Sequence, residues 1–315
     1  MNNIFSHQNT LCREVRCEGV ALHSGANVRM VLRPAPCDHG IRFRRTDLSG
    51  RPTIAASFHQ VVDTRLATSL GADGILISTV EHLMAALAGL RIDNVLIELD
   101  GPEVPILDGS AAPFLEVLRD AGQRSQSALR KVIKVQRPIL VREGDAYIKA
   151  YPSDQFRVRY SIDFPHPLVG RQEYTFSLTD STFHREIAKA RTFGFLKDVQ
   201  RLQSMGLARG GSLENALVFD DYNVLNQDGF RFADECVRHK ILDFLGDLTL
   251  AGMPIAGYFE VHKAGHSLHH QFLRELNKRP TSYNVYAATS IPVPLFPVTA
   301  VPAFVDPYQA IAKHL

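Results

Sequence analysis

Cysteine is scarce in this sequence, and charge of neither sign predominates. The four cysteines, at positions 12, 17, 37 and 236, include no CxxC pair, which is the spacing of many zinc and redox sites. This usage predicts reduced thiols in a cytosol rather than a disulfide-stabilised secreted domain. The 35 lysines and arginines nearly balance the 33 aspartates and glutamates. Without a basic excess, the chain is not expected to bind nucleic acid.

Long uninterrupted apolar runs are also missing. The most apolar stretch, 291–305, has prolines at 292, 294, 297 and 302, which a membrane-spanning helix would not tolerate. It is expected to form an extended strap over the body of the protein. The first ten residues, MNNIFSHQNT, lack the basic and apolar regions of a signal peptide. Neither GxGxxG nor GxxxxGK[ST] occurs to bind nucleotide phosphates. These absences predict a soluble, cytoplasmic protein.

The length and composition are those of a globular protein with a substantial core. A chain of 315 residues suits one large domain or two ordinary ones, and 45% hydrophobic with 22% charged residues is typical of such folds. The polar segment 122–131, GQRSQSALRK, lacks apolar periodicity and is predicted to be a linker. It separates a predicted N-terminal domain, 1–124, from a C-terminal domain, 129–315.

Both parts mix strands and helices. Runs with β-type patterns predict strands at 26–35, 92–106, 131–141, 146–152, 156–164 and 254–262. Helical spacing predicts helices at 79–90, 110–121, 183–191, 234–251 and 266–277. Strand hairpins beside isolated helices favour an α+β fold over a doubly wound parallel sheet.

Three acidic or imidazole side chains recur at four-residue intervals in VRHKILDFLGD, residues 237–247. At 100° per residue, His239, Asp243 and Asp247 lie within an 80° arc of one helix face, while apolar residues cover the other side. The spacing is compatible with a row of groups collected for chemistry. It is equally compatible with the solvated side of an amphipathic helix, which is the commoner case.

A second concentration of ionisable groups opens the helix predicted at 79–90. Ser78 and Glu81 have the spacing of a capping box, in which the glutamate reaches back to an exposed backbone N–H. In the alternative interpretation, the positive end of the helix keeps Glu81 ionised and His82 neutral, the states wanted in a base and in a metal ligand.

Four histidines occur within nine residues of HKAGHSLHHQF, residues 262–272. His262, His266 and His270 follow one another at four-residue intervals, so this stretch could hold zinc by itself. Surface histidine clusters are common, however, and these residues could be polar filling. The segment ARTFGF, 190–195, predicts only a turn after a helix.

Histidine and carboxylate without cysteine suit a catalytic zinc, which usually has three protein ligands and one open position. His82, His239 and Asp243 would supply two imidazoles and one carboxylate from two distant helices. Nothing local in the sequence shows that those helices meet.

Several long motifs resemble one known family. They are GVALHSGANVRMVLRPAP (19–36), STVEHLMAALAGLRIDNVLIELDGPEVPILDGSAAPF (78–114), ARTFGFLKDVQRLQSMGLARGGSLENALVFDD (190–221), CVRHKILDFLGDLTLAGMPIAG (236–257) and HKAGH (262–266). Together they resemble the UDP-3-O-acyl-N-acetylglucosamine deacetylases, zinc amidases of lipid A synthesis. The resemblance runs over nearly the whole chain. It implies two similarly folded, layered α+β domains with the active site between them.

The resemblance also implies roles for individual residues. His82, His239 and Asp243 would hold one catalytic Zn²⁺. Glu81 would be the general base toward water, and His266 the acid that protonates the leaving nitrogen. Asp247 would support His266, and Thr192 would donate a hydrogen bond to the oxyanion. His262, His269 and His270 have no ligand role in the family.

Substrate contacts follow from the same resemblance. Lys240 and Phe193 would lie near the sugar, and Phe164 and Lys263 near the nucleotide. Ala146 stands where the family often has a basic nucleotide contact. An apolar passage would take the fatty acyl chain, and its expected lining is Leu196, Val199, Leu202, Leu207, Ala216 and Val218.

Two rival functions belong to other classes. A zinc deacetylase of another N-acetyl sugar would keep the same reacting groups but change the apolar passage. A non-catalytic sugar-nucleotide or lipid binder would have a broken set of reacting groups, whereas all five reacting or ligating positions are present. The expected partner is an amphiphilic UDP-sugar. The protein is expected to be a monomer that associates at most transiently with a membrane surface.

Overall fold

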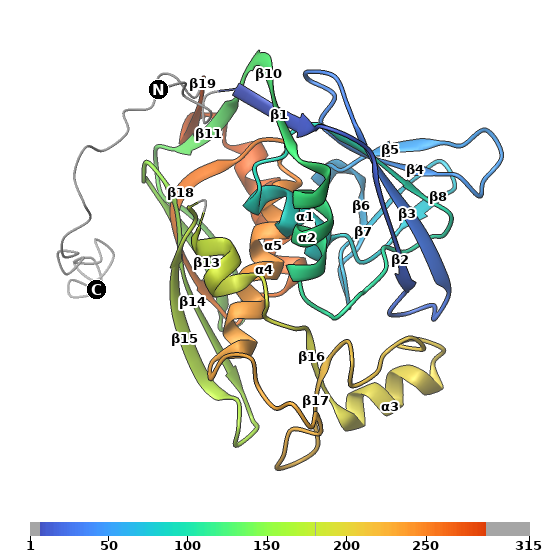
Figure 1. The fold of residues 1–315 in the computed structure, drawn as a ribbon. Helices are drawn as coiled ribbons and strands as arrows, with labels where there is room; N and C mark the ends of the chain where they lie inside the picture. Colours follow the sequence, from blue (N-terminus) through green and yellow to red (C-terminus); the bar gives the residue numbers. More distant parts are fainter. Residues whose placement is uncertain (1–6, 180, 288–315) are drawn as a thin grey trace, which may run out of the picture.

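A computed structural model describes residues 7–179 and 181–287, and the predicted strap at 291–305 lies outside this part. The fold is α+β, as predicted, with several sheets arranged around central helices (Figure 1). In the described ranges, no helix is both long and apolar enough to span a membrane.

The N-terminal half is built on a mixed five-stranded sheet in the order β2-β3-β9-β4-β5. Its strands are β2 (Val15–Val20), β3 (Asn27–Pro34), β4 (Ile41–Arg45), β5 (Thr53–Ala55) and β9 (Val95–Leu99). A smaller antiparallel sheet comprises β6 (Val61–Asp63), β7 (Ser69–Ala72) and β8 (Ile75–Ile77). Helices α1 (Glu81–Gly89) and α2 (Ala112–Ala121) precede and follow the central strand β9.

The C-terminal half is built on a mixed seven-stranded sheet with β18 (Ile255–His262) at its centre. Its other strands are β11 (Lys131–Val135), β12 (Ile139–Glu143), β13 (Ala146–Tyr151), β14 (Phe156–Phe164), β15 (Gly170–Ser177) and β19 (Tyr283–Ala287). Helices α4 (Glu235–Thr249) and α5 (His266–Lys278) precede and follow β18. The order helix, central strand, helix therefore occurs in both halves. The prediction of two similarly folded domains divided near residue 124 stays a prediction.

The predicted linker is instead a strand. Residues 123–129 form β10 (Gln123–Leu129), which pairs antiparallel with β1 (His7–Leu11). The sequence did not predict this strand because most of its side chains are exposed and polar, so they show no alternation of apolar and polar residues. The segment that connects the two halves is therefore held in place by its hydrogen bonds to the N-terminal strand.

The predicted helix at 183–191 is also wrong in detail. A short π-helix covers Phe183–Ile187, and the chain then turns before a strand, β16 (Phe193–Phe195), which pairs in parallel with β17 (Leu217–Phe219). Between these strands lies α3 (Leu196–Ser204), which stands apart from the central helices in Figure 1.

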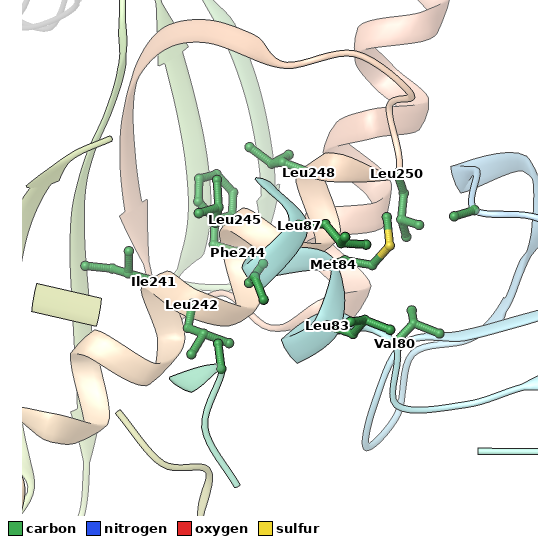
Figure 2. Close-up of a cluster of buried hydrophobic side chains, with 14 of the residues drawn as sticks. Val80, Leu83, Met84, Leu87, Ile241, Leu242, Phe244, Leu245, Leu248 and Leu250 are labelled. Carbon is green, nitrogen blue, oxygen red and sulfur yellow. The ribbon is translucent and has the colours of Figure 1, made fainter. Parts of the chain in front are cut away.

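The two halves meet where α1 packs against α4. Figure 2 shows the two helices side by side, and their buried apolar side chains, among them Leu83, Met84 and Leu87 from α1 and Leu242 and Leu245 from α4, belong to one hydrophobic cluster. This buried packing explains why the helix predicted from amphipathic spacing at 234–251 is in fact surrounded by protein.

Gly246 allows a close backbone approach between these helices. A Cβ placed there would overlap the Glu81 carbonyl oxygen and lie 2.8 Å from the carbonyl carbon. Because both atoms belong to the backbone, α1 would have to move away as a unit. The absence of one side chain thus allows the first turn of α1 to pack against the last turn of α4.

Gly246→Ala is therefore expected to destabilise the fold by about 1–3 kcal/mol and to abolish activity, since moving α1 displaces Glu81 and His82 together. Urea unfolding and turnover measure the two effects. Gly265→Ala is the control, because a Cβ at Gly265 meets no atom within 4 Å. Wild-type stability and turnover in Gly246→Ala would contradict the proposed role of the close approach.

Candidate active site

The crossing of α1 and α4 brings together the three residues expected to bind a metal. The Nε2 atoms of His82 and His239 lie 3.6 Å and 3.2 Å from Oδ1 of Asp243. The two imidazole rings are perpendicular, with centroids 5.0 Å apart. All three side chains are buried, with residue exposures of 2–4%. The alternative of a solvated helix face is therefore wrong.

The donor atoms of this cluster fit a metal cation. One ligand atom from each of His82, His239 and Asp243 lies within 4.8 Å of the others. Asp243 Oδ1 is buried and has no hydrogen-bond partner in the described part of the chain, a costly condition for a carboxylate oxygen unless a cation faces it. Asp243 Oδ2 accepts a 2.5 Å bond from Lys240 Nζ.

The second ring nitrogen of His239, Nδ1, supports the same conclusion. Its Nδ1 lies 3.1 Å from the carbonyl oxygen of Ala190, to which it can donate, and this leaves Nε2 with a lone pair toward Asp243. Burial lowers the pKa of His239 to about 3, so the imidazole is neutral at pH 7. A neutral, oriented imidazole is the form that binds metal.

Glu81 is the first residue of α1 and lies beside this cluster. The predicted capping box does not form: Val80 is the N-cap residue and makes no side-chain cap, and Ser78 Oγ instead accepts from Ser69. The Glu81 carboxylate bonds outside its own helix, and its Oε2 accepts a hydrogen bond from the Thr68 backbone N–H at 3.1 Å. Burial raises the pKa of Glu81, which makes this carboxylate a better proton acceptor than an exposed one.

His266, the first residue of α5, lies on the other side of Glu81. Its Nε2 is 3.7 Å from Glu81 Oε1, and its Nδ1 is 2.7 Å from Asp247 Oδ2. Burial alone would lower its pKa, but the charges of Asp247 and Glu81 and the hydrogen bond to Asp247 raise the pKa of His266 to about 9. His266 is therefore an imidazolium at neutral pH and can donate a proton from Nε2.

Thr192 is positioned by a buried ion pair. The preceding residue, Arg191, is 1% exposed, and its guanidinium bonds to Glu235 at 2.9 Å at the start of α4. Thr192 itself donates from its backbone N–H to Gly109 and accepts from Leu217, both at 2.8 Å. The next ring, Phe193, lies 6.2 Å from the His239 ring. These contacts hold the Thr192–Phe193 turn beside α4.

Three of the expected sugar and nucleotide contacts lie close together. Lys240 Nζ lies 5.9 Å from the centre of the Phe193 ring, and Phe164 packs edge-on against Phe193 at 5.4 Å. Lys263 is further out, where its Nζ bonds to Asp145 at 2.7 Å. Ala146 follows Asp145 at the start of β13. Contact of Phe164, Lys263 and the Ala146 position with a nucleotide stays a prediction.

A groove of about 640 Å³ adjoins α3. From the expected passage segment it is lined by Leu202 and Leu207, together with Met205. The remaining apolar lining comes from the N-terminal half, namely Leu66, Ala67, Leu76 and Pro102. Sequence reasoning missed this half of the lining, because no local pattern relates residues 66–102 to residues 202–207.

The other expected passage residues lie around this groove rather than among its lining. Leu196 and Val199 are partly buried residues of α3, a helix with no buried residue. Val218 is buried in β17, and Ala216 directly precedes that strand. Their contact with an acyl chain stays a prediction.

Comparison with known proteins shows the family to which this site belongs. A family model described as "UDP-3-O-acyl N-acetylglycosamine deacetylase" matches residues 8–278. A Myxococcus xanthus protein named UDP-3-O-acyl-N-acetylglucosamine deacetylase is 51% identical over 282 residues, which is 90% of each chain. A protein of that name from Nitratidesulfovibrio vulgaris is 51% identical over 287 residues, 91% of this chain and 92% of its own. The same name is carried by a protein from Acidithiobacillus ferrooxidans, 48% identical over 278 residues.

Proposed function

The chain belongs to the UDP-3-O-acyl-N-acetylglucosamine deacetylase family, and from that premise we propose which of its residues carry out the reaction. The enzyme hydrolyses the acetamide of a UDP-linked, 3-O-acylated N-acetylglucosamine to acetate and the free amine, in lipid A biosynthesis. The observation that supports the residue assignment is the buried meeting of His82, His239 and Asp243 beside Glu81 and His266.

Zinc is the proposed ion, held by His82, His239 and Asp243. Two imidazoles and one carboxylate, without cysteine, form a ligand set typical of a catalytic zinc with an open position. When bound, zinc would polarise the amide carbonyl and lower the pKa of water to about 7. Lys240 bonds to the other oxygen of Asp243 and so holds this carboxylate with Oδ1 toward the two imidazoles.

Glu81 is the proposed general base. Its carboxylate accepts a proton from the water that attacks the acetamide carbonyl carbon, and the Thr68 N–H keeps the carboxylate in place during this transfer. The raised pKa of Glu81, which burial causes, favours this uptake of a proton.

His266 and Thr192 act on the other two atoms of the amide. The His266 imidazolium donates its Nε2 proton to the departing nitrogen as the C–N bond breaks, so the sugar leaves as a neutral amine. Asp247 keeps Nδ1 of His266 engaged, which leaves Nε2 as the donating atom. The Thr192 hydroxyl donates to the carbonyl oxygen, on which negative charge develops.

Removal of the metal is expected to abolish deacetylation, and one equivalent of zinc per chain is expected to restore it. The described residues contain two His/His/Asp groups, but in the second, Asp247 with His266 and His269, both carboxylate oxygens already accept hydrogen bonds, whereas Asp243 Oδ1 has no hydrogen-bond partner among the described residues. Elemental analysis gives the metal content, circular dichroism shows whether the stripped protein stays folded, and turnover of the UDP-linked substrate gives the activity. Full turnover by folded, verifiably metal-free protein would contradict the proposal.

The remaining properties are proposed from the family and the composition. We place the enzyme in the cytoplasm as a monomer that meets its amphiphilic substrate near a membrane surface. No excess of basic residues provides for a nucleic-acid partner.

A further inference from the structure

Asp247 accepts hydrogen bonds from three side chains, of which the proposed reaction uses one. Its Oδ2 lies 2.7 Å from Nδ1 of His266 and also 2.7 Å from Nδ1 of His269. Its Oδ1 accepts from the Thr68 hydroxyl at 2.5 Å. Two imidazoles three residues apart on α5 therefore share a single carboxylate oxygen.

His269 has no access to the substrate. Its residue exposure is 0%, and its ring packs edge-on against Phe244 at 5.0 Å. Its second nitrogen, Nε2, lies 3.2 Å from the hydroxyl of Tyr160, which is itself enclosed and lies 2.7 Å from the Ala264 carbonyl oxygen. The result is a continuous buried chain of polar contacts from Tyr160 through His269 and Asp247 to His266.

The protonation state of His269 follows from its surroundings. Burial lowers the pKa of His269, so the ring is neutral and carries one N–H. Asp247 can only accept, which assigns that proton to Nδ1 and leaves Nε2 as an acceptor. The single proton of the Tyr160 hydroxyl lies between two acceptors, the Ala264 carbonyl oxygen at 2.7 Å and His269 Nε2 at 3.2 Å. His269 therefore holds Asp247 through the same oxygen that bonds to His266.

We propose that His269, supported by Tyr160, is a positioning residue for the general acid: it holds Asp247 in the orientation that aims His266 at the leaving nitrogen and takes up part of the charge on Oδ2. This inference rests on the proposed role of His266 as the acid. A carboxylate oxygen that already accepts one hydrogen bond is a weaker acceptor for a second, so sharing Oδ2 limits how strongly Asp247 retains the proton on His266.

The limit matters because a general acid works best when its pKa lies near the working pH. Burial lowers the pKa of His266, but the charges of Asp247 and Glu81, which contact it directly, and the charge of Asp243 raise its pKa above the ordinary value. The Thr68 hydroxyl, 3.3 Å from Nδ1, and His269 are the neutral groups that face the same pair. Since the acid must be protonated, the rate falls as pH rises through its pKa of about 9.

Replacing His269 by leucine tests the inference. We expect kcat to fall roughly 10- to 100-fold, the cost of removing a hydrogen bond to a charged group, with KM and metal content unchanged. The basic limb of the kcat profile is expected to move to higher pH, because Asp247 then bonds to His266 alone through Oδ2. His269→Asn, which keeps a donor near the Nδ1 position, is expected to return the limb toward wild type and recover most of kcat.

Two further variants keep the test decisive. His270→Leu makes the same exchange one residue later, at a ring whose Nδ1 has no partner among the described residues, and is expected to match wild type. Tyr160→Phe removes only the outer hydroxyl and is expected to shift the limb in the same direction by less, even if His269→Leu fails to fold. Folded, metal-loaded His269→Leu or Tyr160→Phe with a wild-type basic limb would overturn the inference. Unchanged turnover in His266→Ala would instead overturn the proposed function.

Discussion

Replacing Glu81 by glutamine is expected to lower kcat by about 10²–10⁴-fold, the usual contribution of a general base, while metal content stays at the wild-type level. Glutamine has the shape of glutamate and can still accept the N–H of Thr68 through its carbonyl oxygen, so α1 should keep its place. It cannot take up a proton from water. Single-turnover kinetics with elemental analysis of the same sample separates the loss of the base from a loss of metal.

The neighbouring residue provides the contrast. His82→Ala removes one of the three proposed ligands and is expected to lose metal together with activity. Glu98→Gln makes the same exchange on β9, where the carboxylate pairs with Arg33 and Arg44 away from the site, and should turn over like wild type. If Glu81→Gln emptied the site while His82→Ala kept its metal, the assigned roles would be reversed.

Removing the 3-O-acyl group from the substrate is expected to lower kcat/KM by several orders of magnitude. The groove beside α3 has a volume of about 640 Å³ and is lined by apolar side chains from both halves of the chain. Each methylene transferred from water contributes about 0.8 kcal/mol, so a chain of ten or more carbons can supply much of the binding free energy. That binding also fixes the sugar relative to the reacting groups.

The lining itself can be tested on α3. Leu202→Ser is expected to reduce the preference for long over short acyl chains, at little cost in stability because α3 contains no buried residue. Leu213→Ser is the matched control, since Leu213 is 45% exposed and does not line the groove. Equal rates with and without the acyl chain would favour the rival function, a deacetylase of other N-acetyl sugars.

Local chemistry in the sequence was sufficient for the helices that carry the site. The sequence pattern predicted helices at 79–90, 234–251 and 266–277, and the structure has them at Glu81–Gly89, Glu235–Thr249 and His266–Lys278. Apolar residues recur at helical spacing in each of these segments, so the helices are visible in a single chain even where, as in α4, most of the helix is buried. The long motifs around His82 and His239 were equally sufficient for the family.

Tertiary contacts decided what the local patterns left open. The spacing of His239, Asp243 and Asp247 is the same for a solvated face and for a reactive row, and only the close approach of α1 at Gly246 makes it a buried row. Glu81 does not form the predicted capping box. Its carboxylate instead accepts a buried hydrogen bond from the backbone N–H of Thr68, the residue before β7. Segment 123–129 is a strand because β1, more than a hundred residues earlier, pairs with it.

The histidine-rich segment shows the same division within a few residues. His266, His269 and His270 are alike as letters, yet His266 faces Glu81, His269 is enclosed between Asp247 and Tyr160, and His270 Nδ1 has no partner in the described structure. Helical spacing assigns each residue a direction on α5. Which direction meets a carboxylate depends on α1, α4 and β14, whose positions arise from packing between segments far apart in the sequence.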